Sequence, residues 1–500
     1  MRITNKMMTN NMMSNINKNK LNMTTLEEQY SSGKKIQRPS DDPIITVRAL
    51  KLRTNLSELS QYYEKNIPDA QSWMDVTESA LTTVNDVLKQ INTYCVQGSS
   101  DTLTASDRSS IAQNLEQMKQ QIYQEGNTNY AGRYVFTGYK TDSSLIFSED
   151  MDYLTYNITQ DFTGDDLQVV NKVSGSYDIE DYDDSATDFS ESPKLNEVYR
   201  IQLAYDKLST DAPTSISYFK EDSSGILTEQ TPISSNINSI SSTDPEAYTP
   251  DADEIHYIPE TGEVIMGADV YKELRTANKI EMQYQKTGFE SGSLKPEHYF
   301  TCTMTDGDKP EQGDITYTKS EEGQDIQYEV NYNQKIKVNT EGSDAITHQI
   351  GRSIEDILAT VNEVTDTESK IAEVKKRLAD TTLSDEEITR YNKLKDQLDT
   401  ELDLKKEAMQ KAFEKGITTS SEGQDKVNAA VADLGSRAVR LELTENRLSS
   451  QKVDFEDLLS KNEDADLVET YIKYGSAETV YNSSLSAAAK IIKNSLLDFL

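Results

Sequence analysis

The sequence predicts a mainly α-helical protein with an inserted β-rich domain, in which long antiparallel terminal helices form a coiled-coil-like bundle. Both ends of the 500-residue chain carry apolar residues at steps of three and four, the spacing of helices that pack on other helices. The middle has short segments rich in Tyr, Ile and Val between clusters of Gly, Asp, Pro and Ser, which is typical of strands and turns. The predicted order is helices, strands, helices.

The clearest helical spacing lies near the two ends of the chain. On the N-terminal side the apolar residues are Leu81, Val84, Leu88, Ile91 and Cys95. On the C-terminal side they are Tyr481, Leu485, Ala488, Ile492, Leu496 and Phe499. Chain ends usually fray because nothing anchors them. The many apolar side chains among the last residues therefore predict that a partner covers them.

The first 130 residues predict three helical segments. Residues 1–30 are loosely helical, but their Asn and Thr content lowers helix propensity, so we expect this segment to order only on binding. Asp42 followed by Pro43 is a good helix start, and a long helix over 43–97 is expected to end at Gly98. Pro68 lies inside that helix, so it kinks there or two helices abut. A further helix begins at Ser106 or Asp107 and ends at Gly126.

Beyond residue 130 the period changes to that of strands. Residues 130–147 predict a hairpin, because they are rich in Tyr, Val, Phe and Gly. The segments 255–258, 263–266, 280–284 and 326–332 are predicted strands of the insert.

Helical character returns at about residue 344. A charged segment over 366–415 predicts a helical hairpin, with Ser384 and Glu387 as the capping box of its second helix. Another long helix is expected after Gly423, and Asn462 marks the restart that leads to the terminal helix.

These elements predict six regions. They are an N-terminal inner helical segment (1–42), the N-terminal half of a helical core (43–139), an acidic β-rich outer domain (140–340), a helical segment with the charged hairpin (341–423), the C-terminal half of the core (424–462) and a C-terminal inner helix (463–500).

The charge distribution excludes several function classes. The chain has 51 Lys and Arg against 86 Asp and Glu, a net charge of −35, which argues against nucleic-acid binding because phosphate contacts need a basic surface. Residues 141–340 alone contribute 40 acidic and 14 basic side chains, whereas residues 1–50 are mildly basic. No stretch approaches the length of a membrane span, and residues 1–24 lack the apolar core of a cleaved secretory signal.

No motif predicts catalysis, a cofactor or a metal site. Cys95 and Cys302 lie in segments of different character, and we expect a buried apolar residue and a strand residue rather than a disulfide. His256, His298 and His348 have no carboxylate or thiol at metal-ligand spacing, so each is expected to be exposed or hydrogen-bonded. Neither a Gly-rich phosphate loop nor a nucleophile elbow is present.

Two weaker binding hypotheses concern the insert. Its acidic run could bind Ca²⁺, but it lacks the Gly and Glu positions of an EF-hand loop, so a solvated acidic loop is expected instead. The run comprises Asp178, Glu180, Asp181, Asp183, Asp184 and Asp188. The 27 Tyr residues are expected to be half-buried strand side chains, with glycan binding as the alternative.

At both ends the chain resembles the flagellin family. The N-terminal motifs that carry the resemblance are SSGKKIQRPSDDPIITVRAL at 31–50, QYYEKNIPDAQSWMDVTESAL at 61–81 and GRYVFTGYKTDSSLIF at 132–147. The C-terminal motifs are LGSRAVRLELTENRL at 434–448, NEDADLVET at 462–470 and SLSAAAKIIKNSLLDFL at 484–500. The chain departs from the family in its large insert, in the charged hairpin, and in Leu145 and Ile146, where a proline is often found.

The resemblance implies a non-enzymatic structural adaptor of the bacterial flagellum that joins the hook-associated ring to the flagellin filament. Its implied partners are further copies in a homo-oligomeric ring, hook-associated protein 1, flagellin, the flagellar type III export apparatus and an export chaperone. It implies an extracellular location and export without a cleaved signal peptide. The alternatives are a flagellin that forms the filament itself, or a surface adhesin that binds glycans through the insert.

The residues expected to pack between subunits lie in the two terminal segments. They are Ile3, Met7, Ile16, Leu21 and Leu26 at the N-terminal end and Leu485, Ile492, Leu496 and Phe499 at the C-terminal end.

Overall fold

The computed structural model describes residues 5–493 apart from 101–102, 183–188, 223–224, 310, 312, 321–322 and 381–382. The chain divides into two compact units, which we describe separately. Unit 1 comprises Met1–Ala70, Tyr328–Ile336 and Val439–Leu500, and unit 2 comprises Gln71–Gln327 and Lys337–Ala438.

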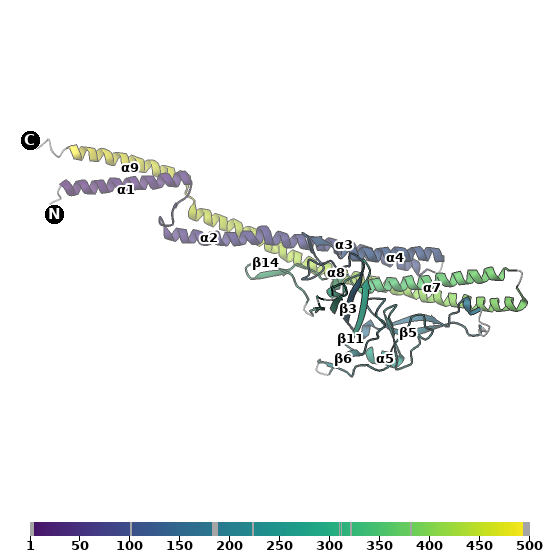
Figure 1. Ribbon diagram of the computed structural model, residues 1–500. Helices are drawn as coiled ribbons and strands as arrows, with labels where there is room; N and C mark the ends of the chain where they lie inside the picture. The colour runs from purple at the N-terminus through teal and green to yellow at the C-terminus, as the bar shows by residue number, and fades with distance from the viewer. Residues whose placement is uncertain are drawn as a thin grey trace, which may run out of the picture. The chain divides into compact units, whose positions relative to one another are not determined.

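Long helices at both ends flank a β-rich middle, which confirms the predicted fold class (Figure 1). The helices are α1 (Asn5–Ser32), α2 (Pro43–Gln61), α3 (Ile67–Gly98), α4 (Ala105–Glu125), α5 (Ala268–Leu274), α6 (Gly342–Ala345), α7 (His348–Leu378), α8 (Asp385–Glu463) and α9 (Leu467–Lys493). Within the described chain no helix combines the length and the apolar character needed to cross a bilayer. The six predicted region boundaries stay a prediction.

The start of α2 and its junction with α3 follow from two prolines. Asp42 caps α2, since its side chain accepts hydrogen bonds from the backbone N–H groups of Ile44 and Ile45 at 3.0 and 3.1 Å. A π-helical turn, η1 (Tyr62–Asn66), stands between α2 and α3, and Pro68 is the second residue of α3. Proline has no N–H for the ordinary helical bond, and a local π turn is one way in which a helix accommodates this.

Two predicted boundaries in the next segment were wrong. The helix α4 begins at Ala105, and its N-cap is Thr104, whose capping box with Asp107 replaces the predicted start at Ser106 or Asp107. The predicted hairpin over 130–147 is reduced to β1 (Asn129–Tyr130) and β2 (Arg133–Tyr134). The rest of that segment belongs to unit 2 and includes an isolated bridge from Ile146 to Leu294.

The β-rich part of unit 2 contains two sheets that share one apolar core. One sheet has the strand order β13-β12-β3-β11-β6-β7 and the other has the order β4-β5-β10-β9-β8, with β8 and β9 parallel. Tyr156 and Met282 of the first sheet belong to the same buried cluster as Ile201 and Tyr257 of the second. Two sheets with a common apolar face form a sandwich.

The four strands predicted by residue range are present. The strands are β3 (Met151–Phe162), β4 (Gln168–Ser174), β5 (Lys194–Gln202), β6 (Ile216–Glu221), β7 (Leu227–Glu229), β8 (Ile237–Ser239), β9 (Ile255–Ile258), β10 (Glu263–Met266), β11 (Lys279–Phe289), β12 (Thr301–Asp306), β13 (Ile315–Tyr317), β14 (Gln327–Asn331) and β15 (Gln334–Lys337).

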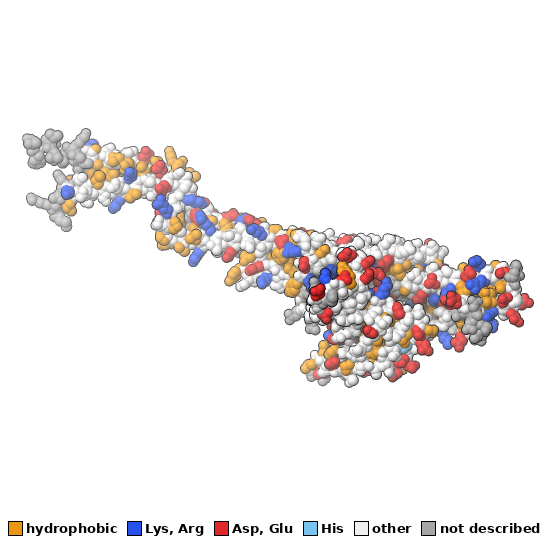
Figure 2. Space-filling view, viewed as in Figure 1, with side chains coloured by type: hydrophobic (Ala, Val, Ile, Leu, Met, Phe, Trp, Pro, Cys, Tyr) orange, Lys and Arg blue, Asp and Glu red, His pale blue; other side chains and the backbone are white. Residues whose placement is uncertain are grey.

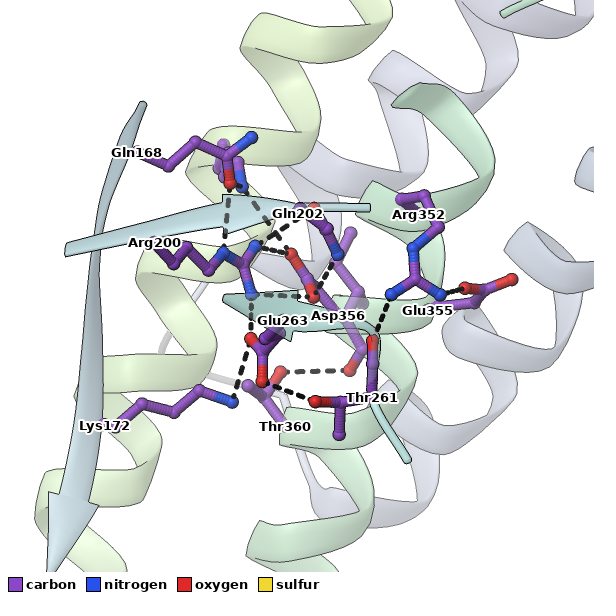
Figure 3. A network of polar contacts seen from close by, with 12 residues as sticks. Gln168, Lys172, Arg200, Gln202, Thr261, Glu263, Arg352, Glu355, Asp356 and Thr360 are labelled. Carbon is purple, nitrogen blue, oxygen red and sulfur yellow. Dashed lines mark hydrogen bonds and ion pairs between the residues drawn. The ribbon is translucent and has the colours of Figure 1, made fainter. Parts of the chain in front are cut away.

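A buried network of charges joins the second sheet to the helices of unit 2 (Figure 3). Arg200 of β5, only 2% exposed, pairs with Glu263 of β10 and with Asp356 of α7. Lys172 of β4 lies 3.7 Å from Glu263, and Lys415 of α8 lies 3.6 Å from Asp356. Burying charges costs free energy unless they are paired, so this network constrains how the sheet sits on α7 and α8.

The charged helical hairpin is confirmed, but its second helix is much longer than expected. Ser384 and Glu387 form the predicted capping box, in which the Ser384 N–H donates to the Glu387 carboxylate at 2.7 Å. The helix α8 then continues to Glu463, so the predicted break at Gly423 was wrong. Gly423 lies inside this helix, and a Cβ there would make an ordinary van der Waals contact with Leu88 of α3 at 3.4 Å.

The loop after β4 packs against this charged hairpin. Tyr182 stacks on Tyr391 of α8 with ring centroids 3.7 Å apart, and Asp178 pairs with Lys370 of α7 at 3.2 Å. Phe189 is buried in the same apolar cluster. The hairpin therefore belongs to the packed structure of unit 2.

Candidate assembly interface

Exposed apolar side chains are concentrated in unit 1. Most of the large apolar side chains that the described chain exposes strongly belong to α1, α2, α9 and the last part of α8 (Figure 2). Exposed apolar groups scattered singly are normal, but a concentration of this kind marks a surface that another molecule covers.

The two terminal helices pair with each other in antiparallel fashion. The rings of Tyr30 in α1 and Tyr471 in α9 lie 5.7 Å apart, and the Asn19 side chain donates to the Ser484 hydroxyl at 3.0 Å (Figure 1). The contacts thus run in opposite directions along the two helices. This confirms antiparallel terminal helices, as predicted.

The contact between α1 and α9 is a narrow stripe. The less exposed positions of α1 fall at Thr9, Met12, Ile16, Asn19, Met23, Leu26 and Gln29, and those of α9 fall at Thr470, Tyr474, Ala477, Tyr481, Ser484 and Ala488. Both sets step mostly by three and four, the seam of a two-stranded coiled coil. Only Ile16 and Ala488 are buried apolar residues in this seam. A seam so poor in buried apolar area gives weak stability to an isolated pair.

Large apolar residues also lie outside the seam. Leu21 and Met7 of α1 are 68% and 54% exposed, and Leu485 of α9 is 41% exposed. The same helix exposes Leu467, Val468, Tyr471, Ile472 and Val480. Helices that are apolar on more than one side are normally buried on more than one side.

The predicted interface residues fall into four groups. Ile16 and Leu26 lie in the seam within the chain, while Met7, Leu21 and Leu485 are exposed. Ile492 belongs to α9, and its side chain is outside the description. The remaining three, Ile3, Leu496 and Phe499, lie outside the described residues.

A polar cluster that the sequence did not predict connects the segments after α1 and after α8. The Lys35 N–H donates to the Glu463 carbonyl at 2.7 Å, and the Ala465 N–H donates to the Gly33 carbonyl at 2.8 Å. Lys34 pairs with Asp464, and Arg53 of α2 pairs with Glu463 at 2.7 Å. These residues are more than 400 positions apart, so spacing along the sequence carries no signal of their contact.

The hairpin of β14 and β15 is a second feature missed by the sequence. It was predicted as part of the insert, but the structure attaches it to the helices of unit 1. The Asn66 side chain of η1 donates to the Glu329 carbonyl at 2.8 Å, and the Gln334 side chain donates to the Thr444 hydroxyl of α8 at 3.1 Å. Val330 is fully buried in this contact.

The five candidate residues for catalysis or metal binding, three histidines and two cysteines, are hydrogen-bonded or buried in the structure. His256 and His298 are hydrogen-bonded to backbone carbonyls at 3.0 and 3.1 Å, as expected. His348 departs from the expectation, because its Nε2 has no hydrogen-bond partner among the described residues, and burial lowers its pKa to about 3. Cys95 and Cys302 are free and buried, which confirms that they form no disulfide with each other.

The acidic run of the insert is only partly visible. Asp178 pairs with Lys370, while Asp183, Asp184 and Asp188 lie outside the described residues. Across the part of the chain that is described, His, Cys, Asp and Glu nowhere form a group of three that could hold a metal ion.

Comparisons with known proteins agree with the motifs of the N-terminal end. Residues 3–141 match the model of the bacterial flagellin N-terminal helical region. The chain is 34% identical over 145 residues to flagellar hook-associated protein 3 of Salmonella typhimurium, which covers 29% of this chain and 45% of that protein. It is 34% identical over 126 residues to a flagellin of Clostridium tyrobutyricum, covering 25% of this chain and 33% of that one.

A solved structure of flagellar hook-associated protein 3 from Legionella pneumophila is 11% identical, covers 82% of this chain and 97% of its own, and aligns with a TM-score of 0.30. The sequence matches span less than half the length of the curated relatives. The match falls on the N-terminal helical region, so this part of the chain is similar to the corresponding region of bacterial flagellins and of flagellar hook-associated protein 3.

Proposed function

We propose that this protein is a structural adaptor of the bacterial flagellum, joining the hook-associated ring to the flagellin filament through packing of terminal helices between subunits. The observation that carries the proposal is the exposed apolar surface of α1 and α9, including Leu21 and Leu485, in a pair whose own seam is thin. Burying one such side chain contributes about 1.5–3 kcal/mol, so a lattice of copies supplies what the isolated pair lacks. The similarity to hook-associated protein 3 supports the same proposal.

The proposed partners are further copies of this chain in a ring, hook-associated protein 1 on one side and flagellin on the other. The proposed location is extracellular, after export through the flagellar type III apparatus with the help of a chaperone. The Asn-rich and Thr-rich composition of α1 supports passage in an unfolded state, because such a helix is weak until it is packed.

Deleting the gene tests this role directly. We expect cells that retain hooks, lack filaments and release flagellin into the medium, as seen by electron microscopy and by blotting the medium. Normal filaments in the deletion strain would refute the adaptor role. In the same background, a chain without residues 491–500 should fail to restore filaments while unit 2 keeps its fold, and full restoration would contradict the terminal interface.

A flagellin is the second candidate, because the flagellin of Clostridium tyrobutyricum matches at the same identity. Copy number separates the two. A filament protein dominates sheared flagella, whereas an adaptor at one junction is a trace component, so quantitative mass spectrometry of sheared flagella decides between them.

A further inference from the structure

A small antiparallel contact joins the two connections that lead to the terminal helices of unit 1. Its centre is a β-bridge between Lys34, which follows α1, and Asp464, which follows α8. Two backbone hydrogen bonds of 2.7 and 2.8 Å flank this bridge, one on each side. We call residues 33–35 together with residues 463–465 the clasp.

Charged side chains hold the clasp closed. Glu463 is 4% exposed, and its carboxylate accepts a hydrogen bond from Arg53 of α2 at 2.7 Å, while Lys34 lies 3.6 Å from the same oxygen. Lys34 also pairs with Asp464. Opening the clasp would separate the buried carboxylate of Glu463 from both cations, which is unfavourable because an unpaired buried charge is costly.

The helix α1 runs directly into the clasp. It ends at Ser32, and the next residue, Gly33, has a φ of 68°. The Gly33 N–H still donates to the Gln29 carbonyl at 2.9 Å, and the Gln29 side chain donates to the Lys35 carbonyl at 2.7 Å. A left-handed glycine commonly ends a helix, because it has no Cβ that would clash in this conformation. The end of α1 is therefore fixed to the clasp.

The start of α9 is fixed to the clasp in a similar way. Asp466 is the single residue between the clasp and the first residue of α9, and it caps that helix. Its Oδ1 accepts from the N–H groups of Val468 and Glu469 at 2.9 and 3.0 Å, the hydrogen bonds of an N-cap. Both terminal helices thus leave the clasp without a flexible connection, so the clasp determines how far each one is shifted along the other.

The contacts between α1 and α9 continue in step with the clasp. The rings of Tyr30 and Tyr471 lie 5.7 Å apart, and further along the pair the Asn19 side chain donates to the Ser484 hydroxyl at 3.0 Å. Moving 11 residues back along α1, from Tyr30 to Asn19, corresponds to moving 13 residues forward along α9, from Tyr471 to Ser484. The two helices therefore keep one antiparallel register over this length.

The seam distinguishes poorly between this register and one that is shifted by a heptad. Among its less exposed positions in α9, Tyr474 and Ala477 are followed seven residues later by Tyr481 and Ser484. A slip of seven residues therefore replaces a tyrosine by a tyrosine and one small residue by another. In the slip that brings Ala477 opposite Asn19, the Asn19 hydrogen bond is lost, but one such bond contributes little net stability.

We propose that the clasp sets the register of α1 and α9, so that the two helices pair in a single alignment although their seam is thin. The inference concerns the single chain and does not depend on the adaptor role. For an assembly, it means that the exposed residues Leu21 and Leu485 are held within about one helical turn of the same level along the pair. A slip of seven residues would shift one of them by about 10 Å.

Disulfide formation in the purified full-length chain tests the register. Asn19→Cys is combined with Ser484→Cys as the in-register pair and with Ala477→Cys as the slipped pair. Each chain is oxidised, denatured and labelled with a maleimide, and its intact mass gives the cross-linked fraction. Native Cys95 and Cys302 are buried in unit 2 and are the same in every variant.

We expect the in-register pair to cross-link and the slipped pair to give little product. Ala477 lies about 10 Å along α9 from Ser484, and a disulfide requires Cα atoms within about 7 Å of each other. The substitutions also remove the hydrogen bond between Asn19 and Ser484, so the register that remains in this chain is the one set by the clasp.

Two insertions of equal length separate the effect of the clasp from that of the length of the connection. Two glycines between Ser32 and Gly33 lie between α1 and the clasp, so they should lower the in-register cross-link several-fold and raise the slipped one. Two glycines between Pro39 and Ser40 lie beyond the clasp, at an exposed turn that should tolerate them. This matched control should leave both yields unchanged.

Substitutions of Gly33 provide a second readout. Gly33→Val should lower the in-register cross-link several-fold, because a β-branched residue is strained at a φ of 68°. Gly33→Asn is the matched control and should keep the cross-link, since asparagine adopts this conformation more easily. A Cβ at Gly33 meets nothing within 4 Å, so crowding does not enter the comparison.

Several results would overturn the role of the clasp. The clasp does not set the register if the chain without insertions forms both cross-links equally or neither of them. The same follows if the insertion before Gly33, or Gly33→Val, leaves the in-register cross-link unchanged. Equal losses from the two insertions would show that the length of the connection sets the register instead. None of these results bears on the adaptor role, which the deletion strain tests separately.

Discussion

Gly416 of α8 lies directly against Cys95 of α3. A Cβ on Gly416 would stand 2.9 Å from the Cys95 Sγ and 2.8 Å from the Ile357 Cδ1 of α7. Three helices therefore meet where one of them has no side chain. Such a contact needs glycine for closeness, although glycine weakens a helix by about 1 kcal/mol relative to alanine.

Gly416→Ala should destabilise unit 2 by about 1–3 kcal/mol, because the added methyl group overpacks this contact. Urea unfolding followed by circular dichroism measures the change. Gly435→Ala in the same helix is the control, since a Cβ there meets nothing within 4 Å. This control should be neutral or stabilising by up to about 1 kcal/mol, and equal effects of the two substitutions would contradict the packing argument.

Arg200→Met should destabilise the sandwich of unit 2 by about 3–5 kcal/mol, because it leaves Glu263 and Asp356 charged without their shared partner. Hydrogen exchange measured by mass spectrometry on peptides of β5 and β10 reports the loss locally. Lys272→Ala breaks an ion pair with Asp269 in which both side chains are mostly exposed, and it should stay within about 0.5 kcal/mol. Unchanged exchange in the Arg200 variant would show that the network carries little stability.

The same network predicts a loss of stability in acid. Burial alone would raise the pKa of Glu263, but the charges of Lys172 and Arg200 outweigh it and lower the pKa from 4.5 to about 2. A lowered pKa in the folded state means that the stabilisation is fully present above pH 4.5 and is lost as the pH falls toward 2. The loss is on the order of 3 kcal/mol, at about 1.4 kcal/mol per unit.

Urea midpoints measured between pH 5.5 and 2.5 check this prediction. Glu263→Gln should be less stable at neutral pH and should lose less on acidification, since it has no carboxylate at this position to protonate. If both proteins lose stability in parallel, the acid sensitivity arises elsewhere in the chain.

Leu21→Asp should leave the free chain folded and prevent its assembly. Leu21 is 68% exposed, so its replacement changes the stability of the chain by no more than about 0.5 kcal/mol. In an assembly every copy would lose the burial of one leucine and gain a buried charge. Circular dichroism of the purified chain and filament counts in complemented cells are the two measurements.

Asn17→Asp supplies the control for charge, because it adds one negative charge to an exposed position of the same helix. Filaments should form normally with this variant. Filament loss in both variants would point to charge at the chain end rather than to the apolar surface of Leu21.

Local rules in the sequence predicted much of the architecture. Asp42 with Pro43 and Ser384 with Glu387 begin helices where expected, because capping depends on residues only two or three positions apart. The strands at 255–258 and 263–266 match their predicted bounds. Leu88, with its partners at helical spacing, is buried as the period predicted.

The errors arose where contacts between segments far apart in the sequence determine the local structure. Gly423 was interpreted as a break between helices, since glycine often ends helices, but α8 continues through it to Glu463. No local pattern shows that Asn66 and Thr444 bind the hairpin of β14 and β15.

The sequence by itself determined the helical ends, the acidic β-rich middle and the resemblance of the ends to the flagellin family, since periodicity, capping and motifs are local and survive without coordinates. Only the tertiary structure decided which apolar residues of the ends face each other and which face outward. It also decided that Glu463 is buried where the segments after α1 and after α8 meet. Such facts depend on contacts between segments hundreds of residues apart, and no spacing along the chain encodes them.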